Sequence, residues 1–446
     1  MHNRPPAPMT VLYWLRNDLR LHDNELLAAL PPNTSALLPV YCFDPVALGT
    51  DAYLDLPRTG PHRLPFLLDT LADLQQRYAA LGSGIHFVVG RPEEVLPALV
   101  KELNAQAVWA STEHTTEEEE AEDALTDALG AQVPLRRFET LSLLHPADLP
   151  IDVRNLPFSF SKFRFDVASR TPVRPPLPAP HHLPPLPAAF VPAPLPTAQA
   201  LATALGQPAP ALPARDRRSA LPALGGGETA GLARLHDYAV ERHLIGRYDD
   251  TRNQLLGEAY STKFSPWLAN GSLSARQIWA AIDEYDAVHG ARSKGALQLR
   301  LELLWRDYFR LLAHKAGPDF FRWRGLREQQ PKPTRPDRAV FDAWAAGRTG
   351  NAFVDANMRE LAATGFMSNR GRQNAASYLI HDLHQDWRWG AAWFEHQLID
   401  HDAASNWGNW KYIAGTGTDV RDTAFDLAQQ AKRYDPQGRY VHTWNK

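Results

Sequence analysis

The apolar positions in the N-terminal part of the chain follow two patterns that alternate. Short apolar runs bounded by polar residues are typical of buried strands, and they occur at residues 10–15, 36–45, 85–90 and 107–111. The segments between and after these runs are predicted helices, at residues 25–31, 61–81, 93–103 and 115–125. Strands and helices that alternate over short connections predict a doubly wound α/β domain with a parallel sheet.

The pattern changes twice further along the chain. Fifteen of the 37 prolines lie between Pro172 and Pro222. Because proline fixes φ and lacks an N–H donor, neither a helix nor an inner strand is expected there. Helical spacing then dominates from Thr229 to the C-terminus. We therefore predict an α/β domain at 9–140, a proline-rich linker at 141–228 that wraps over both domains, and an all-α domain at 229–446.

Residues 365–419 combine an apolar core pattern with an unusual density of polar side chains. At helical spacing three of these side chains share one face, namely Asn369, Arg372 and Gln373. A partly buried Arg372 requires a carboxylate or an anionic ligand, and Asp400 and Asp402 are the candidate partners. A structural ion pair is the alternative. The gathering of amides, a cation and carboxylates favours a polar pocket inside the helical domain.

Composition limits the class of protein. A chain of 446 residues is too long for one ordinary core, which agrees with two domains. An apolar content of 44% and a charged content of 22% are typical of a globular, soluble protein. The net charge of −3 excludes a uniformly basic protein, so any nucleic-acid site is local.

Cysteine usage and hydropathy bear on the compartment. The single cysteine, Cys42, excludes an internal disulfide and is expected to be a buried apolar side chain. No apolar segment is long enough to cross a bilayer, and the N-terminus lacks the apolar region of a secretory signal. A cytoplasmic location with no membrane partner is therefore expected.

A local basic run lies at residues 300–348, which carry eleven Lys or Arg and six Asp or Glu. The run includes Arg322, Arg324, Arg327, Lys332, Arg335 and Arg338. Basic residues beside aromatic ones suit a nucleic-acid-binding surface, and a solvated helix face is the alternative. At the start of this run Glu302, Trp305 and Arg306 fall within one helical turn. From spacing alone they are a surface ion pair beside a core tryptophan.

Hydroxyl-bearing residues precede a predicted helix start at Ser265 and Pro266. Ser261 and Thr262 stand just before Lys263. Hydroxyls and free N–H groups at a helix start bind phosphate well. The spacing alone favours an ordinary capped helix.

Several ordered runs resemble a known family. GFMSNRGRQNAASYL and GAAWFEHQLIDHDAASNWGNW resemble the flavin-binding helical domain of the photolyase/cryptochrome family, and WLRNDLRLHDN resembles its first strand and turn. The runs GFMSNRGRQN, AASNWGNWKYIAGTGTD and AKRYDPQGRYV are similar to the cryptochrome-DASH branch. The resemblance implies FAD in the helical domain. It also implies an antenna chromophore in the α/β domain, such as methenyltetrahydrofolate, and no metal site.

The resemblance assigns a part of the flavin site to each group of residues. The diphosphate is implied to lie on the Ser261–Ser265 motif, and the ring against Arg372 and Asp400. Asn406 matches the residue that faces flavin N5, and Asp402 matches a carboxylate that accepts from the ring edge. The implied cofactor-binding residues are Tyr248, Arg252, Ser261, Thr262, Lys263, Phe264, Ser265, Glu302, Arg306, Asn369, Arg372, Asp400, Asp402 and Asn406.

The resemblance also implies catalytic residues. Glu302 matches a glutamate that hydrogen-bonds the damaged base, and Trp305 matches the tryptophan that packs against it. The residues implied around the lesion are Glu302, Trp305, Asn369, Arg370, Gln373 and Tyr412.

A tryptophan electron relay and an antenna contact are implied as well. Trp410 matches the relay member next to the flavin and Trp387 the middle one. The expected terminal tryptophan falls near Thr334, so Trp323 is the candidate replacement. Glu117 matches a glutamate that contacts the folate in some members, although acidic residues at a helix start are also favoured by the helix dipole.

The implied activity is that of a deoxyribodipyrimidine photolyase. Electron transfer from excited reduced flavin splits cyclobutane pyrimidine dimers in DNA. Single-stranded DNA is the expected preference, because the dimer leaves the stack most readily there, and activity on double strands stays open. We expect the protein to act as a monomer.

Two other functions compete with repair. The first is a blue-light photoreceptor without repair activity; the retained Glu302 and the chain end at Lys446, without a long tail, count against it. The second is an unrelated electron-transfer flavoprotein, which does not explain the helix that carries Glu302 and Trp305 or the basic run.

Overall fold

The computed structural model describes residues 8–207, 211–290, 293–326, 334–417 and 424–446. Its N-terminal part is built around a five-stranded parallel sheet with the order β3-β2-β1-β4-β5. The strands are β1 Met9–Leu15, β2 Thr34–Phe43, β3 His86–Val89, β4 Ala107–Ser111 and β5 Leu135–Phe138. The helices of this domain are α1 Glu25–Ala28, α2 Arg63–Ala80, α3 Pro92–Leu103 and α4 Thr116–Leu129.

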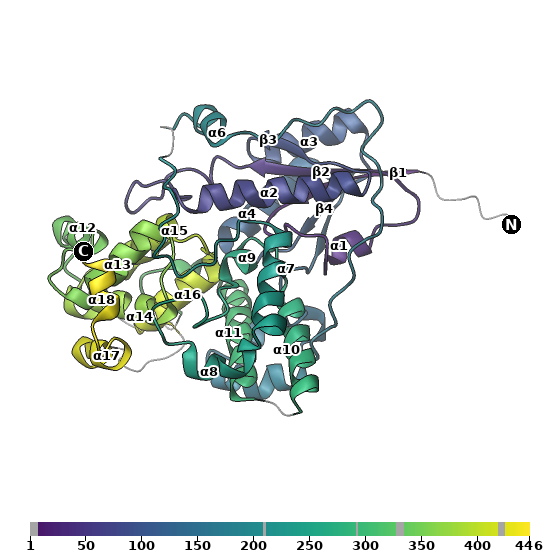
Figure 1. Ribbon diagram of the computed structural model, residues 1–446. Helices are drawn as coiled ribbons and strands as arrows, with labels where there is room; N and C mark the ends of the chain where they lie inside the picture. The colour runs from purple at the N-terminus through teal and green to yellow at the C-terminus, as the bar shows by residue number, and fades with distance from the viewer. Residues whose placement is uncertain (1–7, 208–210, 291–292, 327–333, 418–423) are drawn as a thin grey trace.

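Both faces of the sheet are covered, which explains why its inner strands are apolar at almost every position. Tyr13 of β1 belongs to a core shared with α1 and α2, whereas the neighbouring Leu12 belongs to a core shared with α3 and α4. Figure 1 shows the sheet and these helices above the helical part of the molecule. The predicted doubly wound α/β domain is confirmed, and each expected strand and helix is present within a few residues of its predicted bounds.

The sequence patterns did not predict strand β5. It pairs with β4 at the edge of the sheet, and its two central residues, Arg136 and Arg137, are exposed. A four-residue edge strand with two charges has no apolar run, so hydropathy gives no signal for it. Charged side chains on an edge strand also oppose pairing with a second molecule.

The proline-rich linker contains a helix that was not expected. Helix α6 spans Ala198–Ala204, within the proline-free interval between Pro196 and Pro208. Thr197 caps it by accepting a hydrogen bond from the Ala200 N–H, so an interval of this length suffices for a short capped helix.

Elsewhere the linker wraps over both domains, as predicted. The Leu37 N–H donates to the Pro185 carbonyl on the α/β domain. Arg218 lies over the ring of Trp444, in the last helix of the chain.

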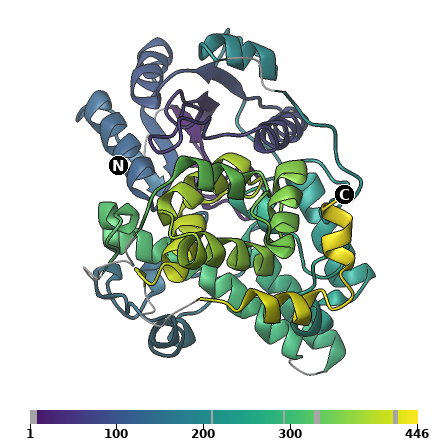
Figure 2. The same cartoon turned by 90° about the vertical axis from the view of Figure 1, so that its left-hand side faces the viewer.

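The C-terminal part is helical and forms the largest core cluster of the protein. Figure 2 shows its green and yellow helices gathered beneath the α/β domain. Its helices are α7 Glu228–His236, α8 Tyr248–Thr251, α9 Ser265–Ala269, α10 Ala275–His289, α11 Lys294–Ala316, α12 Arg338–Ala345, α13 Ala352–Thr364, α14 Asn369–Ser377, α15 Trp387–Gln397, α16 Ala403–Ile413, α17 Leu427–Tyr434 and α18 Arg439–Trp444. Helix α5, Phe160–Lys162, lies in the segment that enters this part.

Buried polar contacts join the two domains. Arg276 at the start of α10 is ion-paired with Asp23 of the α/β domain at 2.7 Å, and both side chains are almost fully buried. Asp307 on α11 accepts from the N–H groups of Leu143 and Leu144 at 2.7 Å each. Because a buried carboxylate must keep its partners, these contacts fix the α/β domain against α11.

Two further predictions concern burial and hydropathy. Cys42 is buried and free in β2, where it packs in the core against α3, as expected for a small apolar side chain. None of the helices among the described residues is long and apolar enough to cross a membrane.

Candidate functional site

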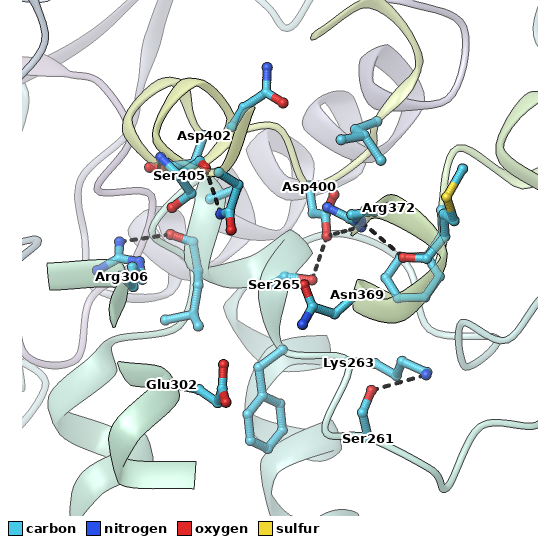
Figure 3. A pocket seen from close by; sticks show the side chains of 18 of the residues that line it. Ser261, Lys263, Ser265, Glu302, Arg306, Asn369, Arg372, Asp400, Asp402 and Ser405 are labelled. Carbon is cyan, nitrogen blue, oxygen red and sulfur yellow. Dashed lines mark hydrogen bonds and ion pairs between the residues drawn. The ribbon is translucent and has the colours of Figure 1, made fainter. Parts of the chain in front are cut away.

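A cavity of about 290 Å³ lies inside the helical domain, and we call it the helical cavity. Its walls come from α8, α9, α11, α14, α15 and α16, which are separated in sequence by up to about 150 residues of chain. All of the predicted cofactor-binding residues line it. Figure 3 shows their side chains converging from these elements. Arg252, Lys263, Arg306 and Arg372 supply its cationic groups, and Glu302, Asp400 and Asp402 supply its carboxylates.

One side of the helical cavity is rich in hydroxyls around a buried cation. Lys263 is 2% exposed, and its Nζ lies 3.0 Å from the Ser261 hydroxyl. Burial lowers the pKa of the Lys263 amine well below its usual range. Thr262 and Ser265 line the same side. A buried amine beside neutral hydroxyls is stabilised when an anion such as a diphosphate approaches it.

The predicted pair of Arg372 and Asp400 is present. Arg372 Nη2 lies 2.8 Å from Asp400 Oδ2, which also accepts from the Ser265 hydroxyl at 2.6 Å. The Asp400 side chain is 1% exposed, and its Oδ1 has no hydrogen-bond partner among the described residues. Arg372 and Asp400 thus form the predicted ion pair in the wall of the helical cavity.

The cation that pairs with Asp402 is not Arg372, the partner that the sequence suggested. Asp402 Oδ2 lies 3.3 Å from Arg310 Nη1, and Asp402 Oδ1 caps α16 by accepting from the Ser405 N–H. Burial alone would raise the pKa of Asp402, but Arg310 and Arg306 hold it below the ordinary value. Asp402 is thus an ionised carboxylate fixed at the helix start.

Asn406 is oriented by the backbone of a neighbouring helix. Its Nδ2 donates to the Ala391 carbonyl of α15 at 2.9 Å. Because the amide nitrogen is held in this way, the side-chain oxygen is the atom left to accept a hydrogen bond in the cavity.

Comparisons with known proteins agree with this geometry. Residues 11–181 match the family model described as DNA photolyase, and residues 299–445 match the model described as FAD binding domain of DNA photolyase. Cryptochrome DASH of Gloeobacter violaceus is 46% identical over 98% of this chain and 85% of its own length. The Xenopus laevis protein of the same name is 44% identical over 97% of this chain and 82% of its own length.

The chain belongs to the cryptochrome DASH branch of the photolyase/cryptochrome family. Its helical domain is an FAD-binding domain, and its cofactor is FAD. Among solved structures, a Synechocystis cryptochrome superposes with a TM-score of 0.92 at 42% identity, covering 99% of this chain and 89% of the other. A class III photolyase from Agrobacterium tumefaciens gives a TM-score of 0.82 at 26% identity, covering 99% and 88%.

The side chains of the helical cavity fit FAD. The buried Lys263 and the hydroxyls beside it offer a cation and donors to a diphosphate. The Asn406 side-chain oxygen, left to accept because the amide nitrogen donates to Ala391, offers an acceptor to an N–H group of a flavin ring.

The predicted lesion residues divide into two groups. Glu302, Asn369 and Gln373 line the helical cavity, whereas Trp305, Arg370 and Tyr412 lie outside its wall. Glu302 Oε1 is held by Arg252 at 2.8 Å and by Gln298 at 2.7 Å, so Oε2 is left for a further donor.

The aromatic residues near Glu302 form a cluster of their own. The Trp305 ring stacks on Phe160 with centroids 3.6 Å apart and lies edge-on to Tyr412 at 6.2 Å. Phe160, which the sequence did not single out, therefore covers one face of the indole that is implied to pack against the lesion.

Only some members of the predicted tryptophan relay pack against one another. Trp410 lines the cavity, and its ring fills the space beside Gly390, one turn along α15 from Trp387. Trp387 donates to the backbone carbonyl of Trp323 at 3.4 Å. The ring that packs edge-on to Trp387 is instead that of Trp407, with centroids 5.5 Å apart.

From Trp407 the aromatic contacts continue to the surface. Tyr53 lies 6.1 Å from Trp407 and is 37% exposed. The chain of rings therefore leads from Trp387 toward the α/β domain, in addition to the predicted route through Trp323.

A larger cavity of about 1030 Å³ lies between the two domains, and we call it the interdomain cavity. Ala269, His401 and Asp402 line both cavities and so form a common wall. Glu117 lines the interdomain cavity, but its side chain is 59% exposed and ion-paired with Arg58 at 2.6 Å.

A deeper carboxylate faces the same interdomain cavity. Glu113 is 4% exposed and accepts from the Asn17 side chain at 3.1 Å. Its position directly after β4, at the carboxyl edge of the sheet, was a signal in the sequence that we did not use.

The basic run of residues 300–348 does not form one surface. Arg300 is paired with Asp283 and Asp286, and Arg310 with Asp402 and Glu113, so these cations are internal. The exposed part of the described run consists of Arg322, Arg324, Arg335, Arg338 and Arg348, while Arg327 and Lys332 lie outside the described residues. Helical spacing turns Arg300 and Arg310 into the core. A count of basic residues does not separate such buried cations from exposed ones.

Arg310 and Glu360 are buried charged residues that the sequence did not suggest, and Arg310 lines the interdomain cavity. Arg310 lies one turn beyond Arg306 on α11, so the helical spacing contained a signal for it. Glu360 on α13 is 1% exposed and accepts from the Tyr440 hydroxyl at 2.5 Å. Only the fold brings α18, which carries Tyr440, against α13.

Glu360 predicts a pH dependence of stability. Burial raises the pKa of its carboxyl from 4.5 to about 7, so the folded state favours the protonated form. The stabilisation that the protonated Glu360 carboxyl contributes is complete below pH 4.5. It is lost as the pH rises through 7, and the free energy of unfolding falls by up to about 3 kcal/mol. Glu360→Gln is expected to flatten the fall in unfolding free energy between pH 4.5 and pH 8, measured by urea titration.

The exposed Glu94 on α3 is the control for this effect. Glu94→Gln should leave the pH dependence as in the natural protein. Equal slopes for the Glu360 variant and the natural protein would contradict the role of Glu360.

Proposed function

We propose that the protein is an FAD-dependent photolyase that repairs cyclobutane pyrimidine dimers in single-stranded DNA. The observation that carries the proposal is Glu302. It lies in the wall of the helical cavity with Oε1 held by two donors, which leaves Oε2 for a donor on a damaged base. A carboxylate so placed, beside the aromatic cluster of Trp305 and Tyr412, suits a base turned out of its stack.

The residues of the helical cavity have separate roles in this proposal. FAD, when bound, reduced and excited by light, supplies the electron that splits the dimer and takes it back afterwards. Lys263 and the hydroxyls of Ser261 and Thr262 hold the diphosphate. The pair of Arg372 and Asp400 lies against the ring, where the guanidinium favours negative charge and the carboxylate accepts from a ring N–H.

Asn406 and Asp402 complete the ring contacts in the proposal. The fixed orientation of the Asn406 amide supports a hydrogen bond from flavin N5–H to its oxygen. Asp402 is ionised and therefore accepts at the ring edge without changing its protonation. Both side chains are held by neighbouring helices, so their contacts cost little reorganisation on binding.

A preference for single strands follows from the cost of extracting the dimer. A dimer in a duplex must lose stacking and pairing before it reaches Glu302, at a cost of a few kcal/mol. Of the exposed basic side chains that the structure describes between Arg322 and Arg338, Arg322 is paired with Asp319 and Arg338 with Asp342. The preference in the proposal therefore rests on the cost of extracting the dimer.

A folate in the interdomain cavity is the second chromophore of the proposal. The volume of that cavity and its buried Glu113 support a ligand with several N–H donors. The wall shared with the helical cavity supports a position for such a ligand beside the proposed flavin site.

Repair of a defined lesion tests the proposed function. Reduced protein is incubated with an oligonucleotide that contains one thymine dimer, as a single strand and as a duplex, under blue light and in the dark. We expect light-dependent recovery of intact thymines, faster on the single strand. Absence of recovery on both substrates would reject repair and favour the blue-light photoreceptor.

The electron relay gives a separate prediction. Trp410→Phe is expected to reduce the rate of light-driven reduction of oxidised FAD to a small fraction, because Trp410 is the ring that links the helical cavity to α15. The change is followed by absorbance under blue light with an external reductant. Trp444→Phe, a buried tryptophan that packs with Tyr440 and Phe353 away from the cavity, is the control. An unchanged rate in the Trp410 variant would remove this residue from the relay.

A further inference from the structure

Three potential metal-ligating side chains meet where the two domains join. His114 follows β4, Glu119 lies in the first turns of α4, and His314 lies in the last turn of α11. One ligand atom from each lies within 4.8 Å of those of the other two. The rings of His114 and His314 are 5.3 Å apart, and His314 Nδ1 lies 2.6 Å from Glu119 Oε1.

The hydrogen bonding of His114 resembles that of a histidine ready to bind a metal. Its ring is 4% exposed, and Nε2 lies 2.8 Å from the buried carboxylate of Glu139. Because a carboxylate accepts, Nε2 carries a proton, and in the neutral imidazole Nδ1 then keeps its lone pair. That Nδ1 is buried and has no hydrogen-bond partner in the described part of the chain. Ligating histidines commonly donate their other ring N–H to a carboxylate in this way.

A buried lone pair without a donor is costly, and no side chain or backbone group among the described residues donates to it. An unsatisfied buried polar atom costs about 1–3 kcal/mol. The other imidazole of the cluster, that of His314, comes from the helical domain, and its side chain is 46% exposed. Glu119 is 33% exposed, so both outer side chains can be reached by an ion from solvent.

We propose that His114, Glu119 and His314 form a binding site for a zinc-type divalent cation that cross-links the α/β domain to the helical domain. Two imidazole nitrogens and one carboxylate oxygen are ligands that Zn²⁺ prefers. Glu139 orients His114 from behind, and a water completes four-coordination.

The site needs only a small rearrangement of exposed side chains. In a tetrahedral Zn²⁺ site with bonds of about 2.0–2.1 Å, ligand atoms lie about 3.4 Å apart. Glu119 Oε1 and His314 Nδ1, which are 2.6 Å apart in their hydrogen bond, must therefore separate, while the three ligand atoms, which lie within 4.8 Å of one another, close around the ion. The side chains of Glu119 and His314 are partly exposed and can rotate. The buried His114 stays fixed by Glu139.

Linear sequence gave no indication of this site. Glu119 and His314 are 195 residues apart, so no compact ligand motif exists. Metal binding would strengthen the contact between the two domains, because α4 and α11 belong to different domains. It would also fix the segment after β4, which lines the interdomain cavity through Glu113 and His114.

Zinc binding to the full chain tests the proposal. FAD-loaded protein without a histidine tag is stripped with a chelator and titrated with Zn²⁺ in competition with a fluorescent zinc chelator. We expect one tightly bound equivalent, and X-ray absorption at the zinc edge should show two imidazole ligands at about 2.0–2.1 Å. His314→Ala and Glu119→Gln should each weaken zinc binding by about 100-fold or more.

The control is His236→Ala, because His236 is an exposed histidine 3.6 Å from Glu241. That variant should bind zinc as the natural protein does, and Zn²⁺ should raise the thermal midpoint of both but not of the His314 variant. The proposal is overturned if the natural protein binds no stoichiometric zinc, or if the His314 and Glu119 variants bind it as tightly as the control. Both variants change exposed side chains, so folding and FAD content provide a check that the loss is local.

Discussion

Arg372→Met is expected to remove most of the FAD from the protein and to destabilise the fold by about 3–5 kcal/mol. The reason is Asp400, whose side chain is 1% exposed and keeps only the Ser265 hydroxyl once the guanidinium is gone. A buried carboxylate without its cation is strongly destabilising, and the ring would lose the cation that lies against it in our proposal. The ratio of flavin to protein absorbance and the thermal midpoint measure the two effects.

An ion pair of similar burial elsewhere in the fold is the matched control. Arg388 is paired with Asp386 at 2.7 Å, with side chains 28% and 9% exposed, against 24% and 1% for Arg372 and Asp400. Arg388→Met should lower the thermal midpoint moderately and leave the FAD content unchanged. If the two variants retain the same amount of FAD, Arg372 has no special part in holding the cofactor.

Glu302→Ala is expected to lower the yield of dimer repair by about ten- to hundredfold while leaving the FAD content intact. A hydrogen bond to a charged group contributes about 1.5–3 kcal/mol, and the carboxylate is the acceptor proposed for the damaged base. Arg252 would be left without its partner, but it is 21% exposed and can turn to solvent. Repair is measured on single-stranded oligonucleotide at equal flavin concentration and light dose.

The exposed Glu284 on α10 serves as the control for this variant. Glu284→Ala should repair as the natural protein does. Loss of flavin from the Glu302 variant would instead show that Glu302 acts in cofactor binding. Unchanged repair yield with full flavin content would remove Glu302 from catalysis.

Local patterns were sufficient for most of the α/β domain. Strands β1 to β4 are apolar runs because both faces of the sheet are covered, and the helices between them keep apolar spacing on the side toward the sheet. The pattern failed where burial was weak, at the charged edge strand Leu135–Phe138. It failed again at α6, where an overall abundance of prolines hid a proline-free interval with its own cap.

The candidate site shows what a motif can and cannot give. Resemblance gave the residues that line the helical cavity, because the family motifs lie in continuous runs of α9, α14 and α16. It did not give their partners. Asp402 is held by Arg310, Asn406 is oriented by the Ala391 carbonyl, and Glu302 is shared between Arg252 and Gln298.

The sequence also could not predict which aromatic rings contact one another. The resemblance implied a relay, but the ring that packs edge-on to Trp387 is that of Trp407, and Phe160 from the linker stacks on Trp305. Such contacts join residues far apart in the chain. Ring packing is decided by how helices meet, and spacing along one helix does not report it.

The sequence by itself determined the two-domain plan, the family, and the set of polar residues around the helical cavity, because periodicity and motifs are local properties. The tertiary structure alone decided which charges are paired, which oxygens are left free, and that His114, Glu119 and His314 converge from two domains. Burial and pairing depend on side chains from several elements at once, and their energies exist only after those elements have packed.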